Sequence, residues 1–167
     1  MSTRANVVIK DEHSSLWFYR HSDGYPECTA VSLIEFLSKH TKGSYRPNVG
    51  QSAGWLVIQG HKEYDSETTG WKVGAYEPTT GRHGDIEYLY VCDLDKMSIT
   101  IYSSSWDGVP EPGKFTVNGD KMLGVISVNR TGYTLSNKRL RKIINNSADQ
   151  FFSDHVAILH IGGNNDS

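Results

Sequence analysis

Residues 30–37 constrain the fold more than any other stretch, because their apolar side chains recur at the spacing of one helix face. The positions i, i+3, i+4 and i+7 are taken by Ala30, Leu33, Ile34 and Leu37. Upstream, Pro26 suits the first turn of a helix, and Glu27 is favourable beside the positive end of the helix dipole. We therefore expect an amphipathic helix that begins near Pro26 and ends between His40 and Gly43.

Short runs rich in β-branched and aromatic residues surround this helix and predict strands. These runs are Asn6–Ile9, Leu16–Tyr19, Trp71–Glu77, Asp85–Cys92 and Ser98–Tyr102. The first two runs predict one hairpin, and the last two predict another that turns at Asp93–Lys96. A short second helix is expected at about Ser52–Ile58. The chain is therefore expected to be an α+β protein: a single domain with a mainly antiparallel sheet and two to four helices packed on it.

The second part of the chain is expected to extend the same fold. Residues 1–102 form the predicted core domain, and 103–113 form a linker loop because Asp107–Gly108, Pro110 and Pro112 interrupt regular structure. Residues 114–161 are predicted to be a hairpin followed by helices, and 162–167 a tail.

Three elements are expected within residues 114–161. Phe115–Val117 and Leu123–Val128 should pair across Asn118–Gly119, since Asn-Gly suits a tight hairpin turn. Leu135–Asn145 predicts a short basic helix. A final helix should start near Ala148 and present one apolar face as far as Leu159.

Charge and cysteine content narrow the class of protein. Seventeen basic residues stand against 19 acidic ones, which gives a net charge of -2 and disfavours binding to duplex nucleic acid. Cys28 and Cys92 lack metal-ligand spacing and fit a reducing compartment. No apolar run reaches the length of a signal peptide or a membrane span. The sequence therefore predicts a cytoplasmic protein without a membrane partner.

One four-residue pattern occurs twice, each time where a predicted strand meets a loop. The two copies are Arg20-His21-Ser22-Asp23 and Arg82-His83-Gly84-Asp85. An arginine can make forked hydrogen bonds to phosphate or carboxylate, a histidine can donate or accept, and an aspartate can orient the histidine or accept from a ribose hydroxyl. If the copies meet, we expect one ligand-binding site, contributed by Arg20, His21, Asp23, Arg82, His83 and Asp85.

Aromatic residues, Tyr25 among them, surround both copies, and an aromatic ring beside an arginine commonly holds a nucleobase. The expected ligand is therefore small and anionic or nucleotide-like. The plainer interpretation stays open, because strand aromatics usually belong to the core and Asp-Gly segments usually form turns.

A catalytic use of the same residues also stays open. His21, His83, Asp23, Asp85 and Glu87 are residue types that bind a divalent metal, so a metal-dependent or histidine-based phosphodiesterase or nuclease is the alternative function. The spacing matches no zinc motif such as HExxH, and the sequence has no GxSxG, P-loop or GxGxxG motif. The sequence therefore favours a protein that is not an enzyme and that needs no cofactor or metal.

Five long segments together resemble a group of small uncharacterised proteins carried by bacteriophages and prophages. They are Ser2–Asn6, Trp17–Glu27, Gln51–Leu56, Trp71–Thr80 and His83–Val91, within about residues 1–102. The resemblance implies an accessory protein in the host cytoplasm that acts by binding, either to a host protein or to a signalling nucleotide of a defence system. A homo-oligomer is compatible with this interpretation. In the relatives we expect Gly at the position of Cys28, which argues against a catalytic thiol there.

Overall fold

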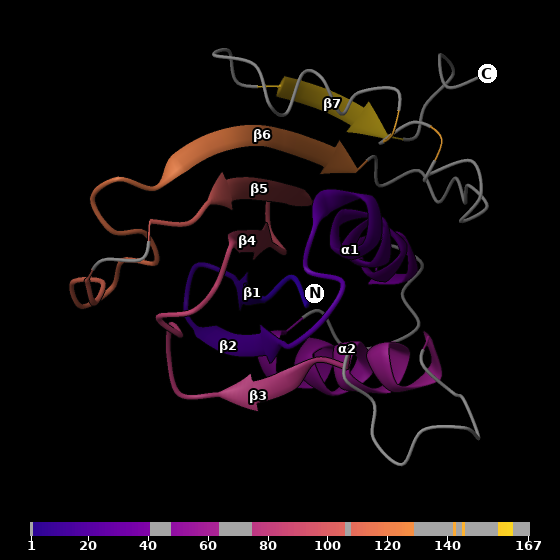
Figure 1. The fold of residues 1–167 in the computed structure, drawn as a ribbon. Coiled ribbons are helices and arrows are strands. Elements are labelled where there is room, and N and C mark those ends of the chain that lie inside the picture. The colour runs from indigo at the N-terminus through magenta and orange to yellow at the C-terminus, as the bar shows by residue number, and fades with distance from the viewer. Residues whose placement is uncertain are drawn as a thin grey trace.

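The computed structural model describes residues 2–40, 48–63, 75–105, 108–128, 142, 145 and 157–161. Its centre is a seven-stranded sheet in the order β3-β2-β1-β4-β5-β6-β7, which Figure 1 shows from β7 at the top to β3 at the bottom. The strands are β1 Ala5–Lys10, β2 Ser15–Arg20, β3 Glu77–Thr79, β4 Tyr88–Asp93, β5 Ser98–Ser103, β6 Lys121–Val128 and β7 Ala157–Ile161.

The sheet is mixed but mostly antiparallel. β1 pairs antiparallel with β2, β2 with β3, β4 with β5, and β5 with β6. β1 and β4 are parallel, as are β6 and β7. Parallel neighbours need a long crossover connection, and the chain between β1 and β4 includes both helices, α1 (Pro26–His40) and α2 (Val49–Glu63). The α+β prediction is thus confirmed, as are the first hairpin and the amphipathic helix.

Both helices lie on one face of the sheet (Figure 1), and the main hydrophobic core lies between. Alternate residues of β1 point to the two faces of the sheet: Val7 and Ile9 belong to this core, whereas Val8 belongs to a second cluster on the other face. From α1, Leu33 and Ile34 are fully buried against the sheet. Among the described residues, no helix combines the length and the apolar composition that crossing a membrane requires.

The other face, which we call the open face, carries no described helix and is covered by loops instead. Its buried hydrophobic residues are Val8, Tyr19, Ile86 and Leu89. Phe115, from the long loop between β5 and β6, packs edge-on against Trp17 of β2, with ring centroids 5.8 Å apart and planes at 64°. This loop therefore supplies part of the cover that helices supply on the opposite face.

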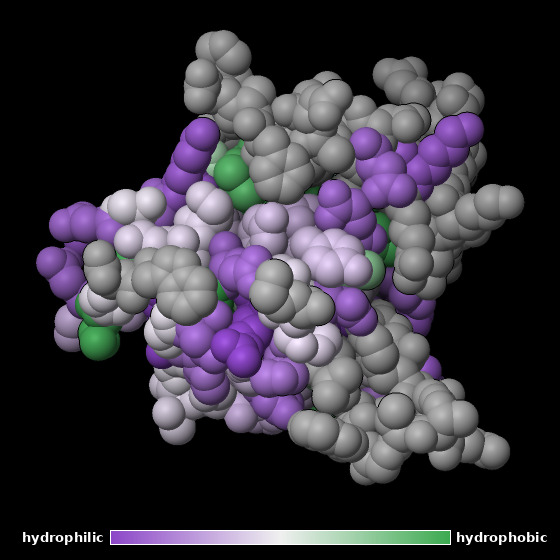
Figure 2. All heavy atoms as spheres, in the orientation of Figure 1, coloured by the Kyte–Doolittle hydropathy of each residue, from purple (hydrophilic) through white to green (hydrophobic). Residues whose placement is uncertain are grey.

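The described surface is mostly hydrophilic on the side that Figure 2 shows, and its hydrophobic spots are small and separate. The large apolar residues that are exposed come from several different elements: Leu16, Tyr25, Trp55, Ile58, Val109 and Met122. Scattered apolar residues of this kind are normal on a folded protein and do not by themselves mark an interface.

Two expectations for the second part of the chain are wrong. Phe115–Val117 forms no strand, and β6 pairs with β5 instead of with this segment. Ala157–Ile161 is strand β7, hydrogen-bonded parallel to β6, and not the end of a helix. The rest of the expected final helix, 148–156, and most of the expected basic helix lie outside the described residues, as do residues 71–74 of the expected strand Trp71–Glu77. Of the described residues of that strand, Glu77 alone lies in β3.

Replacing Leu33 with Ala should lower the free energy of unfolding by about 2–5 kcal/mol, because the side chain is fully buried and its loss leaves a cavity. The matched control is Leu16→Ala in β2, where Leu16 is 43% exposed and the cost should be about 1 kcal/mol or less. Urea denaturation of the two variants measures both values. Equal losses would show that α1 does not bury this face.

Candidate functional site

The segments that carry the repeated pattern meet where three neighbouring strands of the sheet begin or end, and we call this end of the strands the edge of the sheet. Ala5 at the start of β1 pairs with Arg20 at the end of β2 and with Tyr88 at the start of β4. The residues before β1, after β2 and before β4 therefore meet at this edge. We call residues 2–4, 21–25 and 83–87 the rim.

Backbone contacts close the rim tightly. Gly24 N donates to Thr3 O at 2.9 Å, and Glu87 N donates to Arg4 O at 2.8 Å. A Cβ at position 24 would lie 2.7 Å from Thr3 O and 2.9 Å from the Ala5 Cβ. Glycine is therefore required at position 24 because the backbone passes so close to the start of β1.

The two histidines of the repeated pattern converge on one tyrosine. Tyr19 Oη and His21 Nδ1 are hydrogen-bonded at 3.0 Å, and the two ring centroids lie 6.0 Å apart. The His83 ring stacks on the Tyr19 ring with a centroid distance of 4.1 Å and an interplanar angle of 13°. The two imidazoles therefore flank the same phenol although they lie far apart in the sequence.

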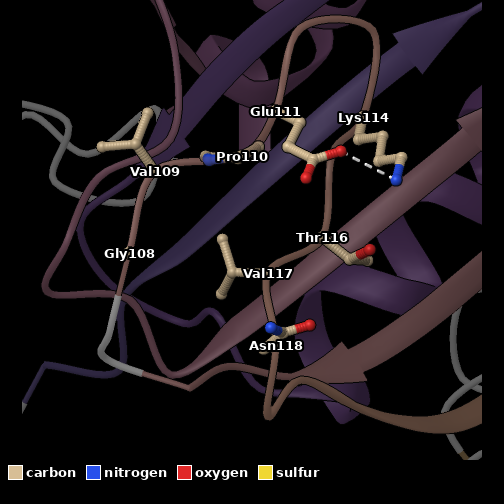
Figure 3. Close-up of a pocket in the computed structure, with 8 residues that line it drawn as sticks. All are labelled: Gly108, Val109, Pro110, Glu111, Lys114, Thr116, Val117 and Asn118. Carbon is tan, nitrogen blue, oxygen red and sulfur yellow. Dashed lines mark ion pairs between the residues drawn. The ribbon is translucent and has the colours of Figure 1, made fainter.

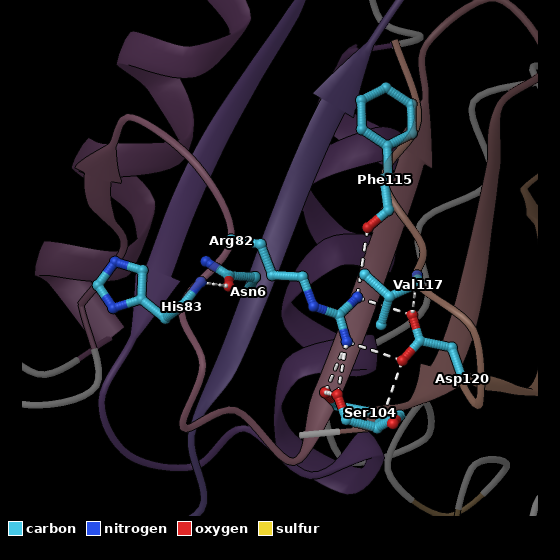
Figure 4. A network of polar contacts seen from close by, with 8 residues as sticks. Asn6, Arg82, His83, Ser104, Phe115, Val117 and Asp120 are labelled. Carbon is cyan, nitrogen blue, oxygen red and sulfur yellow. Dashed lines mark hydrogen bonds and ion pairs between the residues drawn. The ribbon is translucent and has the colours of Figure 1, made fainter. Parts of the chain in front are cut away.

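Two further contacts fix the position of His83. Its backbone N–H donates to Oδ1 of the buried Asn6 at 2.7 Å (Figure 4), and Asn6 Nδ2 donates to Phe18 O at 2.8 Å. Its ring Nε2 is hydrogen-bonded to Thr79 Oγ1 at 2.9 Å. Asn6 thus links β1, β2 and the histidine loop, which sets the ring over Tyr19.

Each imidazole keeps one nitrogen without a partner in the described part of the chain. For His21 this nitrogen is Nε2, and for His83 it is Nδ1. Neither ring is fully buried. Burial raises the pKa of the Tyr19 phenol, the nearby Asp85 charge adds to the rise, and Arg4 partly offsets it. The phenol therefore stays neutral, and each imidazole offers one nitrogen for a further hydrogen bond.

Arg20 does not share this site, because neighbouring residues of a strand point to opposite faces of the sheet. Its side chain lies on the helix side and is 1% exposed. Nη1 donates to Thr29 Oγ1 and Tyr76 Oη, both at 3.0 Å, and the guanidinium lies 4.6 Å from the centre of the Tyr76 ring. The expected forked contact to a ligand is not open to Arg20 in this arrangement.

Arg82 is likewise engaged inside the protein. Its two terminal nitrogens donate to the two carboxylate oxygens of Asp120, each at 2.7 Å, and the two side chains are 4% and 1% exposed. Nη2 also donates to Ser104 Oγ at 2.8 Å and Ser105 O at 3.1 Å, and Nη1 to Phe115 O at 3.3 Å. Figure 4 shows the Arg82 and His83 side chains pointing in opposite directions. Arg82 therefore holds the loop between β5 and β6 and is not turned to the rim.

The remaining predicted site residues lie at the rim. Asp23 has a left-handed backbone with φ 58°, and its carbonyl accepts a hydrogen bond from Thr29 Oγ1 at 2.7 Å. Tyr25 is 37% exposed, and a hydrogen bond with Cys28, followed by the charges of Cys28 and Asp23, raises its pKa. Asp85 forms an ion pair with Arg4 at 3.0 Å. The structure thus keeps the histidines, carboxylates and Tyr25 of the predicted set at this edge but removes both arginines.

Asn6, Tyr19 and Asp120 belong to this arrangement but not to the set of site residues that the sequence predicts. Tyr19 had a usable signal, because residues i and i+2 of a strand share a face and Tyr19 therefore lies beside His21. Asn6 and Asp120 carry no local pattern that distinguishes them from surface polar residues. Their roles depend on contacts with residues 77 and 38 positions away, respectively.

A separate cavity of about 320 Å³ lies in the loop between β5 and β6 (Figure 3). It is lined by Gly108, Val109, Pro110, Glu111, Lys114, Thr116, Val117 and Asn118. Its two charged residues, Glu111 and Lys114, pair with each other at 2.9 Å. The lining therefore presents no net charge, and the cavity contains none of the predicted site residues.

No protein-family model, curated protein or solved structure matches the chain. Within the part of the chain that the structure describes, no group of three or more His, Cys, Asp or Glu residues is arranged to hold a metal ion.

Replacing Asp120 with Asn should lower the free energy of unfolding by about 3–5 kcal/mol at pH 7, because it leaves the Arg82 charge buried without its partner. Urea denaturation measures the loss. The control is Glu111→Gln, which removes one partner of an exposed ion pair and should cost less than about 1 kcal/mol.

The pH dependence of the stability difference between wild type and Asp120→Asn tests whether the ion pair causes it. Burial alone would raise the pKa of Asp120, but hydrogen bonds from Arg82, Val117 N and Ser105 N outweigh it and lower the pKa. An aspartate whose pKa is lower in the folded than in the unfolded protein stabilises the fold. This stabilisation is fully present above the unfolded-state pKa of about 4 and is lost as the pH falls through the folded-state pKa. The difference in the free energy of unfolding between wild type and Asp120→Asn should therefore become smaller below about pH 4. A difference in the free energy of unfolding that does not change with pH would contradict the stabilising role of the ion pair.

Proposed function

We propose that the protein acts by binding a small anionic, nucleotide-like ligand at the rim. One observation carries the proposal: His21 and His83 flank Tyr19, and each keeps one ring nitrogen without a partner in the described part of the chain. Imidazole N–H groups donate to phosphate and carboxylate oxygens. Two imidazoles from separate loops, one hydrogen-bonded to Tyr19 and the other stacked on its ring, favour recognition of a group with several oxygen acceptors, to which each unpartnered nitrogen donates when it carries the proton.

The surroundings of the histidines support binding of a flat, polar molecule. Tyr25 is partly exposed at the same edge and offers an aromatic surface for a base. Asp23 and Asp85 belong to the same rim and supply acceptors for hydroxyl groups. The resemblance to phage and prophage proteins suggests a place for this activity: capture of a signalling nucleotide, or of a host protein, in the host cytoplasm.

Catalysis by the same residues is the competing function. A phosphodiesterase would use His21 or His83 as an acid or base, whereas a binder needs these rings only as hydrogen-bond donors. In the structure the rings are held by Tyr19 and Thr79, both uncharged. This favours the donor role, because a general base of this kind is commonly oriented by a carboxylate.

Purified protein incubated with a nucleotide panel and examined by mass spectrometry should carry a ligand of unchanged mass. His21→Ala and His83→Ala should each weaken binding of that ligand roughly ten- to hundredfold, since a hydrogen bond to a charged group contributes about 1.5–3 kcal/mol. Isothermal titration calorimetry measures the affinities. His13→Ala is the matched control and should change nothing, because His13 is exposed in the turn between β1 and β2.

The hydrolase predicts different results in the same samples. Nucleotides would appear in solution with altered mass, and the histidine variants would bind them without converting them. A chelator would stop turnover by a metal-dependent enzyme, whereas it should leave the affinity of a binder unchanged. Altered nucleotides that disappear in the histidine variants would overturn the proposed function.

A further inference from the structure

Arg4 takes the position at the rim that the sequence assigned to Arg20 and Arg82. It directly precedes Ala5, whose partner in β2 is Arg20, and His21 directly follows Arg20, so Arg4 and His21 leave the paired strands at the same end. Strand alternation gives Arg4 the same face as Asn6 and Val8, the open face on which Tyr19 and His83 lie. Burial raises the pKa of the Tyr19 phenol, and the Arg4 charge partly offsets that rise, as expected for a cation on the same face.

The hydrogen-bonding groups of Arg4 are only partly used. Nη1 pairs with Asp85 Oδ2 at 3.0 Å. Nε is buried and has no hydrogen-bond partner, and Nη2 makes no hydrogen bond within the described part of the chain. A buried donor without a partner is rare in folded proteins, because it loses its bond to water without replacement. The unused donors lie side by side, since Nε–H and one Nη2–H of a guanidinium point in the same direction.

Accessibility separates Arg4 from the other two arginines. Its side chain is 38% exposed, whereas Arg20 as a residue is 1% exposed and the Arg82 side chain is 4% exposed. Both terminal nitrogens of Arg82 donate to the carboxylate of Asp120. Asp85 takes only one nitrogen of Arg4, and Nε and Nη2 have no partner in the described part of the chain, so Arg4 can be oriented by Asp85 and still bind an anion.

We propose that Arg4 is the anion anchor of the rim and that its Nε–Nη2 edge receives the phosphate group of the ligand. Two parallel N–H···O bonds to one phosphate are the arrangement that a guanidinium provides and an ammonium does not. His21, which follows β2 at the same end of the strands, supplies a further donor to the same group. This inference rests on the proposed function and names the chemistry by which the ligand is held.

The test compares AMP, adenosine and inorganic phosphate on the full chain by isothermal titration calorimetry. AMP should bind the wild type more tightly than adenosine does. Arg4→Ala should weaken AMP binding roughly ten- to hundredfold and should leave adenosine binding unchanged. Arg4→Lys should recover less than half of the lost binding free energy, because it keeps the charge without the fork. Lys96→Ala is the control, since Lys96 is exposed in the turn at the opposite end of β4. Melting curves confirm that each variant is folded.

The outcomes separate this inference from the proposed function. If AMP binds the wild type and Arg4→Ala equally, or Arg4→Lys restores full affinity, the anchor is not Arg4 while the proposed function stands. If neither AMP nor inorganic phosphate binds the wild type, the binding of phosphate-bearing ligands fails and the inference fails with it. Loss of AMP affinity in Arg4→Ala with adenosine unaffected supports both.

Discussion

The buried ion pair between Arg82 and Asp120 holds the open face of the sheet together. In the described part of the chain, helices cover one face and loops cover the other, and the polar backbone groups of these loops need partners. The Asp120 carboxylate accepts from Ser105 N at 2.8 Å and Val117 N at 2.9 Å, and Arg82 donates to two backbone carbonyls of the same loop. One ion pair thus ties both ends of the loop between β5 and β6 to the loop that carries His83.

This constraint also shapes the rim. Arg82 and His83 are neighbours in the chain, and their side chains point in opposite directions (Figure 4). Arg82 pairs with Asp120, and His83 stacks on Tyr19. In the other copy, strand alternation separates the two side chains: Arg20 lies on the helix side of the sheet, and His21 lies beside Tyr19. Each copy of the repeated pattern is therefore divided between a structural arginine and a histidine at the rim.

The sequence predicts best those features that depend on local spacing. The period of Leu33, Ile34 and Leu37 fixes α1, and the β-rich runs fix β1 and β2, because these signals come from residues a few positions apart. The partner of β6 has no such signal: Asn118–Gly119 indicates a turn, which the structure confirms, but not which strand lies beside it. Ala157–Ile161 was misassigned because apolar residues at helical spacing also fit a short strand.

The candidate site was predictable only in part, for the same reason. The positions of His21 and His83 at strand ends indicated a common edge, and the structure brings both to Tyr19. Residue type alone does not tell an arginine that binds a ligand from one that is buried with Asp120 or beside Tyr76. That distinction depends on the fold, because the partners of both arginines lie 38 and 56 positions away.

Side-chain NMR of the histidines during titration with AMP tests the central claim most directly, namely that His21 and His83 form one site. Variants at each position assign the two imidazole signals, and His13 and His61, both exposed elsewhere, serve as internal references. The account predicts that the His21 and His83 signals shift together along one binding curve while the reference signals stay unchanged. A ligand that binds and shifts only one of the two, or neither, would contradict it.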